Sequence, residues 1–348
     1  MQPAIRRPRT WAVAVVAGLA VALVTALWLW QANRQTSTRL TQPERLQCPL
    51  PRQPADHQHA GMVWVPGGEF MFGDTVYPEE QPLHTKTVAG FWMDRTEVSN
   101  EQFAQFVRAT GYVTVAERPV DAALQSALPP EMRLPGAVVF AMPSTVSGQG
   151  DLRQWWRYVA GAQWRHPGGP GTSIDGRGAF PVVAVTHADA LAYARWKGTS
   201  LPSEVQWEWA ARGAQTGAAP AAHDQPAAAN TWQGLFPVAN SGEDGFVGLA
   251  PVGCYAPNAA GLFDMIGNVW ELTADRWTPD HNPDAPPGSD PAPFQRPFVS
   301  AQRVIKGGSF LCAPNYCMRY RAGARQAQEE DLAASHLGFR TIRLAAPP

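Results

Sequence analysis

Two cysteines five positions apart are the residues of this chain best suited to chemistry. Cys312 and Cys317 enclose the segment Ala-Pro-Asn-Tyr. On a straight strand they would point to opposite faces, but Pro314 and Asn315 favour a turn. A turn could bring the two sulfurs together. Paired thiols in a turn serve as a disulfide, as a site for a soft metal ion, or as a redox couple.

The residues after the pair favour thiolates. Arg319, Arg321 and Arg325 follow closely, and nearby guanidinium charge stabilises a thiolate over a thiol. Two thiolates without an adjoining His or Cys partner suit a low-coordinate soft ion such as Cu(I), whereas zinc usually takes about four ligands. A short structural disulfide would suit an oxidising compartment. The residues alone leave the disulfide and the reactive site open.

The elements that must position this pair are short. Capping residues and glycine stops predict three helices, with limits at Ser99 to Gly111, Thr186 to Gly198 and Ser203 to Gly213. Strands are expected within 63–73, 91–94, 181–185 and 338–343, and directly before the cysteine turn. Glu204 and Glu208 share a face of the third helix, and we interpret them as partners in scaffold salt bridges.

Composition agrees with an irregular α+β protein. The 348 residues suffice for one large domain or two ordinary ones, and 45% are hydrophobic, enough for a core. The 31 Gly and 33 Pro predict many loops and turns. Fourteen Trp indicate a rigid aromatic interior or a peptide groove.

The N-terminal region predicts a membrane anchor. Residues 11–30 are apolar and uncharged, long enough for a transmembrane helix, and three arginines before them favour a cytoplasmic N-terminus. We expect a cytoplasmic segment at 1–10, a signal anchor at 11–30, a linker at 31–59 and one domain at 60–348. The protein would be single-pass in the inner (cytoplasmic) membrane, with its domain on the periplasmic or extracytoplasmic side. A cleaved signal peptide is the alternative, but Leu27 to Trp30 form a poor cleavage site.

The net charge and the number of cysteines exclude two classes of protein. Residues 1–45 contain six of the 28 Lys and Arg and one of the 29 Asp and Glu, so the remainder carries a net charge near −6. Such a domain is not suited to nucleic acid. Four cysteines are too few for a disulfide scaffold. Cys48 and Cys254 have no local partner, and whether they pair is open.

Two segments of the chain resemble one enzyme family. Gly307 to Arg321 read Gly-Gly-Ser-Phe-Leu-Cys-Ala-Pro-Asn-Tyr-Cys-Met-Arg-Tyr-Arg, and Ser335 to Arg340 read Ser-His-Leu-Gly-Phe-Arg. Both resemble the formylglycine-generating enzymes, which activate sulfatases by oxidising one cysteine. The resemblance runs from about Met62 to the C-terminus. It implies the formylglycine-generating-enzyme variant of the C-type-lectin-like fold, an α+β domain with little regular secondary structure.

The resemblance implies a post-translational modification with defined reactants. Cys312 and Cys317 would hold Cu(I) and would be joined by the thiolate of the substrate, where O2 would be activated. A cysteine in a Cys-x-Pro-x-Arg motif would become Cα-formylglycine, at the expense of O2 and a thiol reductant. The substrate would be an unfolded or extended segment of a sulfatase polypeptide.

The resemblance also implies roles for residues around the pair. Ser309 would act beside the metal, hydrogen-bonding oxygen or the substrate thiol. The expected pocket residues are Trp270, Tyr316, Arg325 and His336. Trp270 would form a wall, and Tyr316 and Arg325 would support the cysteine turn. His336 stands where some members have Asn.

Two calcium sites are implied by the same resemblance. The first would use the side chains of Asn230 and Asp244 and the carbonyls of Thr231 and Phe246. The second would use the side chains of Asp264 and Glu271 and the carbonyls of Gly267 and Val269. The family more often has Asn at the position of Asp264, although Asp also supplies a ligand oxygen.

Two other functions compete with this interpretation. One is a non-catalytic binding module on the same fold, anchored at the membrane; the cysteine pair argues against it. The other is a relative that uses non-haem iron, which would require a His and carboxylate triad. The chain has no His-x3-His or similar motif, which makes an iron site a poor match.

Overall fold

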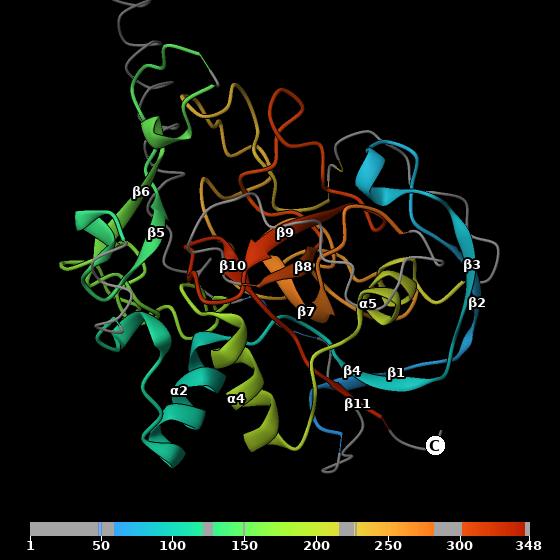
Figure 1. Ribbon diagram of the computed structural model, residues 1–348. Helices are drawn as coiled ribbons and strands as arrows, with labels where there is room; N and C mark the ends of the chain where they lie inside the picture. Colours follow the sequence, from blue (N-terminus) through green and yellow to red (C-terminus); the bar gives the residue numbers. More distant parts are fainter. Residues whose placement is uncertain are drawn as a thin grey trace, which may run out of the picture. The chain divides into compact units, whose positions relative to one another are not determined.

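The chain builds short elements joined by long irregular segments (Figure 1). The computed structural model describes residues 48, 50, 59–120, 128–148, 150–215, 226, 228–281 and 301–344, all within the unit Gln47–Pro348. The α-helices are α2 (Asn100–Thr110), α4 (His187–Lys197) and α5 (Glu204–Ala211). Single 3-10 turns lie at Pro78–Glu80, Val115–Glu117, Pro130–Met132 and Leu152–Gln154.

The strands form four small sheets. Their bounds are β1 (Met62–Val65), β2 (Gly68–Phe72), β3 (His84–Val88), β4 (Phe91–Asp94), β5 (Gly136–Phe140), β6 (Trp156–Ala160), β7 (Trp270–Arg276), β8 (Gln302–Lys306), β9 (Arg325–Glu329), β10 (Leu337–Gly338) and β11 (Ile342–Arg343). The largest sheet has the order β10-β7-β8-β9, and a second has the order β1-β4-β11. Two antiparallel pairs, β2-β3 and β5-β6, complete the set. The cysteine motif connects β8 to β9, so the central sheet carries it.

The predicted helix limits are confirmed by their capping contacts. At α2, the Ser99 hydroxyl accepts from the Gln102 amide N–H, and the Gln102 side chain accepts from the Ser99 N–H. Gly111 then ends the helix in the left-handed region, at φ 67°. The helices α4 and α5 begin with the same reciprocal contact, at Thr186 and Ser203. Each cap satisfies backbone donors that the first helical turn leaves without partners.

One predicted strand is wrong and another is divided. Residues 181–185 are buried but irregular: only Pro181 makes a bridge, and Ala184 has φ 56°. A left-handed residue cannot continue an extended ladder, so apolar content alone misled the prediction. The predicted strand at 338–343 becomes two strands, because β10 pairs with β7 whereas β11 pairs with β4. The chain therefore crosses from the central sheet to its neighbour there.

The main hydrophobic core lies between the helix pair α2 and α4 and the central sheet. Phe103 from α2 stacks on Tyr193 from α4 with ring centroids 6.0 Å apart. Leu272 and Ile305 from β7 and β8 belong to the same buried cluster, and so do both cysteines of the motif. The cysteine turn is therefore packed against the core instead of lying in a surface loop.

A buried ionic network connects α5 to the central sheet. Lys306 Nζ lies 3.0 Å from Glu208 and 3.5 Å from Glu204. Arg325 donates to Glu204 at 3.1 Å, and Arg212 to Glu208 at 2.8 Å. All five side chains are almost entirely inaccessible to solvent. The scaffold salt bridges predicted for the two glutamates are confirmed.

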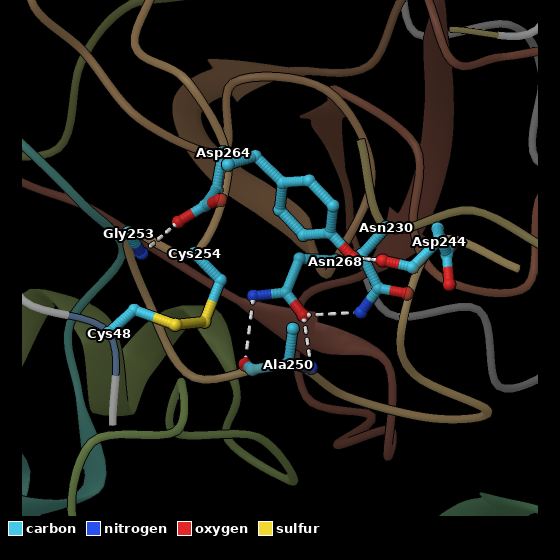
Figure 2. Close-up of a disulfide and its surroundings, with 9 residues drawn as sticks. Cys48, Asn230, Asp244, Ala250, Gly253, Cys254, Asp264 and Asn268 are labelled. Atoms are coloured by element: carbon cyan, nitrogen blue, oxygen red, sulfur yellow. Dashed lines mark hydrogen bonds between the residues drawn. A yellow bond between two sulfur atoms is a disulfide. The ribbon is translucent and has the colours of Figure 1, made fainter. Parts of the chain in front are cut away.

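A disulfide joins Cys48 to Cys254, which settles the open question of their pairing (Figure 2). It closes a loop of 206 residues and fixes a residue of the predicted linker on the domain. Beside it, the Gly253 amide N–H donates to the Asp264 carboxylate at 2.5 Å. The disulfide therefore lies next to Asp264, one of the predicted calcium ligands.

The predicted localisation requires correction. Within the described residues, no helix combines the length and the apolar character that crossing a membrane requires. This finding overturns the prediction of a single-pass protein of the inner membrane. The run at residues 11–30 on which that prediction rested lies outside the described residues, as do the predicted segment at 1–10 and most of the linker at 31–59.

Removal of the buried cation Arg321 should destabilise the fold. Its guanidinium is inaccessible to solvent and pairs with Asp74 and Glu80. In Arg321→Leu two buried carboxylates would lose their counter-charge, so we expect a loss of about 3–5 kcal/mol of unfolding free energy. Urea denaturation measures this quantity. The control Arg153→Leu removes an exposed pair with Asp151 and should change nothing measurable; equal effects of the two substitutions would contradict the prediction.

Candidate active site

The connection after β8 is shaped by two glycines. Gly307 and Gly308 have φ angles of 93° and 75°, in the left-handed region that favours glycine. A side chain at Gly308 would approach the Arg319 carbonyl oxygen to 2.8 Å and the Cys312 sulfur to 3.3 Å. The backbone can therefore pass directly behind the cysteine only because this residue has no side chain.

The predicted turn brings the two sulfurs together. The Cys312 N–H donates to the Ser309 carbonyl at 2.9 Å, and the Cys317 N–H to the Ala313 carbonyl at 3.0 Å. These bonds wind the segment so that the two Sγ atoms lie 2.6 Å apart. Both cysteines are free and buried. The turn prediction is confirmed, and the pair can hold a metal ion or oxidise to a disulfide with little backbone movement.

The two thiols have different electrostatic surroundings. The hydrogen bond with the Cys312 thiol lowers the pKa of Cys317, and contacts with Arg319 lower it further. Burial raises the pKa of Cys312. Arg319 is held in place by Glu79, 2.5 Å from its Nη2, and by the Tyr77 ring, 4.1 Å from its guanidinium carbon. Cys317 is therefore the first of the two to become a thiolate.

An aromatic cluster fixes the opposite side of the turn. Asn315 donates to the Phe236 carbonyl at 3.0 Å and accepts from the Phe236 N–H at 3.2 Å. The Tyr316 ring stacks on Phe236, with centroids 4.1 Å apart and an interplanar angle of 9°. The Trp232 N–H also donates to the Cys312 carbonyl at 3.0 Å. The turn is therefore held on one side by Arg319, which is paired with Glu79, and on the other side by the aromatic cluster at Phe236.

A cavity of about 440 Å³ opens in front of the pair. Six predicted site residues line it: Ser309, Cys312, Cys317, Trp270, Tyr316 and His336. Arg325 does not; its guanidinium is buried against Glu204, although its carbonyl accepts from Arg319 at 3.2 Å. Arg325 thus supports the turn from behind.

Sequence reasoning missed part of the cavity wall. The hairpin β5-β6 contributes Val138 and Trp156, and β9 contributes Gln326, Gln328 and Glu329. Neither the β5-β6 hairpin nor the strand β9 carries a sequence motif that would identify these residues. Arg319 was noted only as nearby positive charge. These residues belong to the wall because separate elements fold against the turn.

His336 is a neutral imidazole in this cavity. It is packed against Trp156 with ring centroids 4.6 Å apart, and its Nδ1 is buried without a hydrogen-bond partner among the described residues. Burial lowers its pKa to about 4. The residue therefore offers a hydrogen-bonding group without charge at neutral pH.

The first predicted calcium set partly fits a hard cation. Asn230 is buried, and its Oδ1 lacks a hydrogen-bond partner among the described residues, although its Nδ2 is bonded to Gly248 and Asn268. Asp244 lies beside it (Figure 2) and accepts from the amide N–H groups of Thr231 and Phe246. A buried acceptor without a donor is costly. A cation bound to it would remove that cost.

In the second predicted calcium set, Glu271 is already paired with Arg340, and Asp264 lies near a further carboxylate, that of Glu97. Both Glu271 oxygens accept from Arg340 at 2.7 Å, and one also accepts from Trp207. One oxygen of Asp264 and one of Glu97 are instead buried without a hydrogen-bond partner in the described part of the chain. Burial raises the pKa of Asp264 to about 6 and raises that of Glu97. The second calcium set stays a prediction.

The structure presents two free thiols side by side on an irregular α+β scaffold, and comparisons with known proteins identify the family. The family described as "Sulfatase-modifying factor enzyme 1-like domain" matches residues 48–345. The formylglycine-generating enzyme of Mycobacterium tuberculosis is 48% identical over 291 residues, covering 81% of this chain and 97% of that enzyme. The formylglycine-generating enzyme of Thermomonospora curvata is 43% identical over 305 residues, covering 84% and 96%.

A solved structure agrees with this result. PvdO from Pseudomonas aeruginosa superimposes with a TM-score of 0.55 at 25% identity, covering 85% of this chain and all of that chain. The chain therefore belongs to the formylglycine-generating-enzyme family. The predictions of the family, of the fold class and of an enzymatic role are confirmed.

The partly buried His336 should make the fold sensitive to acid. Because its folded pKa of about 4 lies below the usual value near 6.5, this neutral histidine contributes stability above pH 6.5 that is lost as the pH falls towards 4. The loss should be about 2–3 kcal/mol between pH 7 and 4.5. Urea denaturation at both pH values should show a smaller loss in His336→Asn than in the wild type. Equal losses would refute the assignment.

Proposed function

We propose that this enzyme oxidises a cysteine of a sulfatase polypeptide to Cα-formylglycine, using O2 and a copper ion held by Cys312 and Cys317. The observation that carries the proposal is the pair of free, buried thiols whose sulfurs lie 2.6 Å apart at a cavity. Its relatives are named formylglycine-generating enzymes, which supplies the class of reaction. The substrate motif would be Cys-x-Pro-x-Arg.

The residues present fit Cu(I). Two thiolate sulfurs are soft ligands, which this ion prefers, and the lowering of the Cys317 pKa by its hydrogen bond with Cys312 favours the deprotonated form that a metal requires. No group of three or more His, Cys, Asp or Glu suited to a metal occurs in the described residues, so these thiols would hold the ion without further protein ligands of those types. When bound, copper would supply the electron transfer between thiolate and O2.

The overall reaction balances with one further reactant. The substrate carbon loses one hydrogen and its C–S bond and gains a C=O bond. One oxygen atom of O2 enters the aldehyde and the other leaves as water, while the sulfur leaves as hydrogen sulfide. Two electrons and two protons must then come from a reductant, which we assign to a pair of external thiols that becomes a disulfide.

The chain's own residues would bind and orient the substrate. Ser309 is buried in the cavity wall, and its hydroxyl accepts from the Leu311 N–H at 3.3 Å, which leaves its proton to donate to oxygen or to the substrate thiol. Trp270 closes one wall, and Tyr316, stacked on Phe236, closes another. These rings limit water at the sulfurs, where it would compete for the reacting groups.

Calcium would have a structural role at the first predicted site. Asn230 precedes Trp232, whose N–H bonds to the Cys312 carbonyl, so the segment that would hold the cation also holds the cysteine turn. The orphaned Asn230 oxygen supports this proposal. A cation there would stabilise the segment that holds the cysteine turn through Trp232, without contacting the substrate.

The alternative of a non-catalytic binding module is not favoured. A binding surface does not require two buried free thiols whose sulfurs lie 2.6 Å apart. The non-haem iron alternative lacks support for a similar reason, because the cavity presents one histidine, His336, and one carboxylate, Glu329, among the described residues. That set is too small for a His and carboxylate triad.

Copper binding and turnover should depend on the pair. Reduced wild-type protein should bind one Cu(I) in competition with a chromogenic chelator, and should convert a Cys-x-Pro-x-Arg peptide to the aldehyde by mass spectrometry. Cys317→Ser should lose both properties. The control Met318→Leu removes a neighbouring, partly exposed sulfur and should retain both. Copper binding that is retained in Cys317→Ser would contradict the proposal.

Calcium should raise thermal stability through Asn230. At 100 times its dissociation constant, a ligand of the folded state adds about 2.7 kcal/mol, so wild-type Tm should fall on chelation. Asn230→Ala should lose most of this difference. The control Asn240→Ala removes an oxygen that already accepts from the Gly242 N–H and should keep the response. A response unchanged in Asn230→Ala would rule out this site.

A further inference from the structure

The disulfide between Cys48 and Cys254 fixes a segment that has no regular structure of its own. Residues 250–255 contain neither helix nor strand, so their conformation depends on contacts with other parts of the chain. The disulfide attaches this segment to Cys48. Leu50 packs over the adjoining Gly253, since a Cβ atom at that glycine would lie 2.2 Å from Leu50 Cδ2. Cys48 and Leu50 therefore hold the segment in place from one side.

The other side of the segment contacts the first predicted calcium site (Figure 2). The Ala250 N–H donates to Asn268 Oδ1 at 3.0 Å, and the same oxygen accepts from Asn230 Nδ2 at 3.0 Å. The Tyr255 hydroxyl donates to the backbone carbonyl of Asp244 at 3.3 Å. Asn230 and Asp244 are the residues whose side chains would bind the cation. The segment therefore contacts one of them directly and the other through Asn268.

The contacts through Asn268 orient the oxygen that would bind the cation. Asn230 Nδ2 donates to Asn268 and to the Gly248 carbonyl. Because an amide group is planar, these two bonds also fix the direction of Asn230 Oδ1, which is buried without a hydrogen-bond partner among the described residues. Asn268 also donates to Glu97 at 3.0 Å. Loss of the Ala250 contact should therefore weaken the cation site without abolishing it.

Reductants can reach this disulfide in the folded protein. Cys48 and Cys254 are both partly exposed, whereas the free cysteines Cys312 and Cys317 are buried. Thiol–disulfide exchange requires that an attacking thiolate can approach one of the two sulfurs. Reduction would leave residues 250–255 attached only by their hydrogen bonds and apolar contacts. The bond thus combines access from solvent with a short connection to the cation site.

We propose that the Cys48–Cys254 disulfide is a redox-sensitive switch that sets the affinity of the first predicted site for calcium. An external dithiol breaks the S–S bond, supplies two electrons and two protons to form two cysteine thiols, and itself becomes a disulfide. The released segment then adopts other conformations, and the observed affinity falls with the fraction of molecules that keep the binding conformation. This inference rests on the structural role proposed for calcium at Asn230.

A calcium titration in two redox states tests the switch. The full chain carries Cys312→Ser and Cys317→Ser, so that Cys48 and Cys254 are its only cysteines. Competition with a chromogenic chelator measures the Kd for Ca2+ before and after reduction with dithiothreitol. We expect the Kd to rise about tenfold on reduction. A variant that also carries Cys48→Ser and Cys254→Ser should show the weaker affinity of the reduced protein, and dithiothreitol should not change it.

The reverse effect follows from thermodynamic linkage. If the disulfide strengthens calcium binding about tenfold, saturating calcium must lower the equilibrium ratio of reduced to oxidised protein by the same factor. Alkylation of free thiols followed by mass spectrometry measures this ratio in a dithiothreitol buffer of fixed redox composition. Asn230→Ala should remove the calcium effect on the ratio. The control Asn240→Ala, which alters an asparagine outside the predicted ligand set, should keep it.

The two measurements separate this switch from the proposed function. Equal calcium affinities in the two redox states, or a thiol–disulfide ratio that does not respond to calcium, would overturn the switch alone. A calcium effect that persists in Asn230→Ala would overturn its assignment to this site. Absence of calcium binding in the oxidised protein would overturn both the calcium role and the switch. Peptide oxidation is scored separately with the Cys312 and Cys317 pair intact, and its failure would overturn only the oxidase proposal.

Discussion

The structure depends on the neutralisation of charges that are buried behind the cysteine turn. Arg321 and Arg325 emerge from the chain directly after the second cysteine, and their guanidiniums are inaccessible to solvent. Buried guanidiniums and carboxylates must be paired, because an uncompensated buried charge costs several kcal/mol. The partners come from distant segments: Asp74 and Glu80 for Arg321, and Glu204 for Arg325. The ion pairs therefore join the connection between β2 and β3, and α5, to the end of the motif.

The same constraint makes the thiol pair possible. Two buried sulfurs 2.6 Å apart would repel each other as thiolates, and burial alone disfavours the charged form. Arg319, fixed by Glu79 and Tyr77, places positive charge beside one of them. The pair is thus asymmetric, with Cys317 easier to ionise than Cys312. A soft cation would satisfy both sulfurs and relieve the remaining repulsion.

The cavity has an aromatic end at the sulfurs and a polar end along β9. Near the sulfurs, the wall is formed by the rings of Trp270 and Tyr316, the neutral His336 and the charged Arg319. Towards the end of β9, Gln326, Gln328 and Glu329 make the wall polar.

The sequence by itself determined the local chemistry. The helix caps at Ser99, Thr186 and Ser203 follow from reciprocal contacts within four residues, and the turn at Pro314 follows from backbone preferences. The motif around the two cysteines was sufficient for the family. Each of these features depends on residues close together in the chain, so short-range pattern and propensity describe them well.

Only the tertiary structure decided which distant residues meet. The pairing of Cys48 with Cys254, 206 residues apart, has no local signal. The same holds for Glu97 near Asp264, and for Glu329 in the cavity wall. The apolar segment 181–185 was misjudged because hydrophobic content reports burial and not strand pairing. Contacts of this kind arise when whole elements dock, and their identity depends on the combined packing and charge of the complete domain.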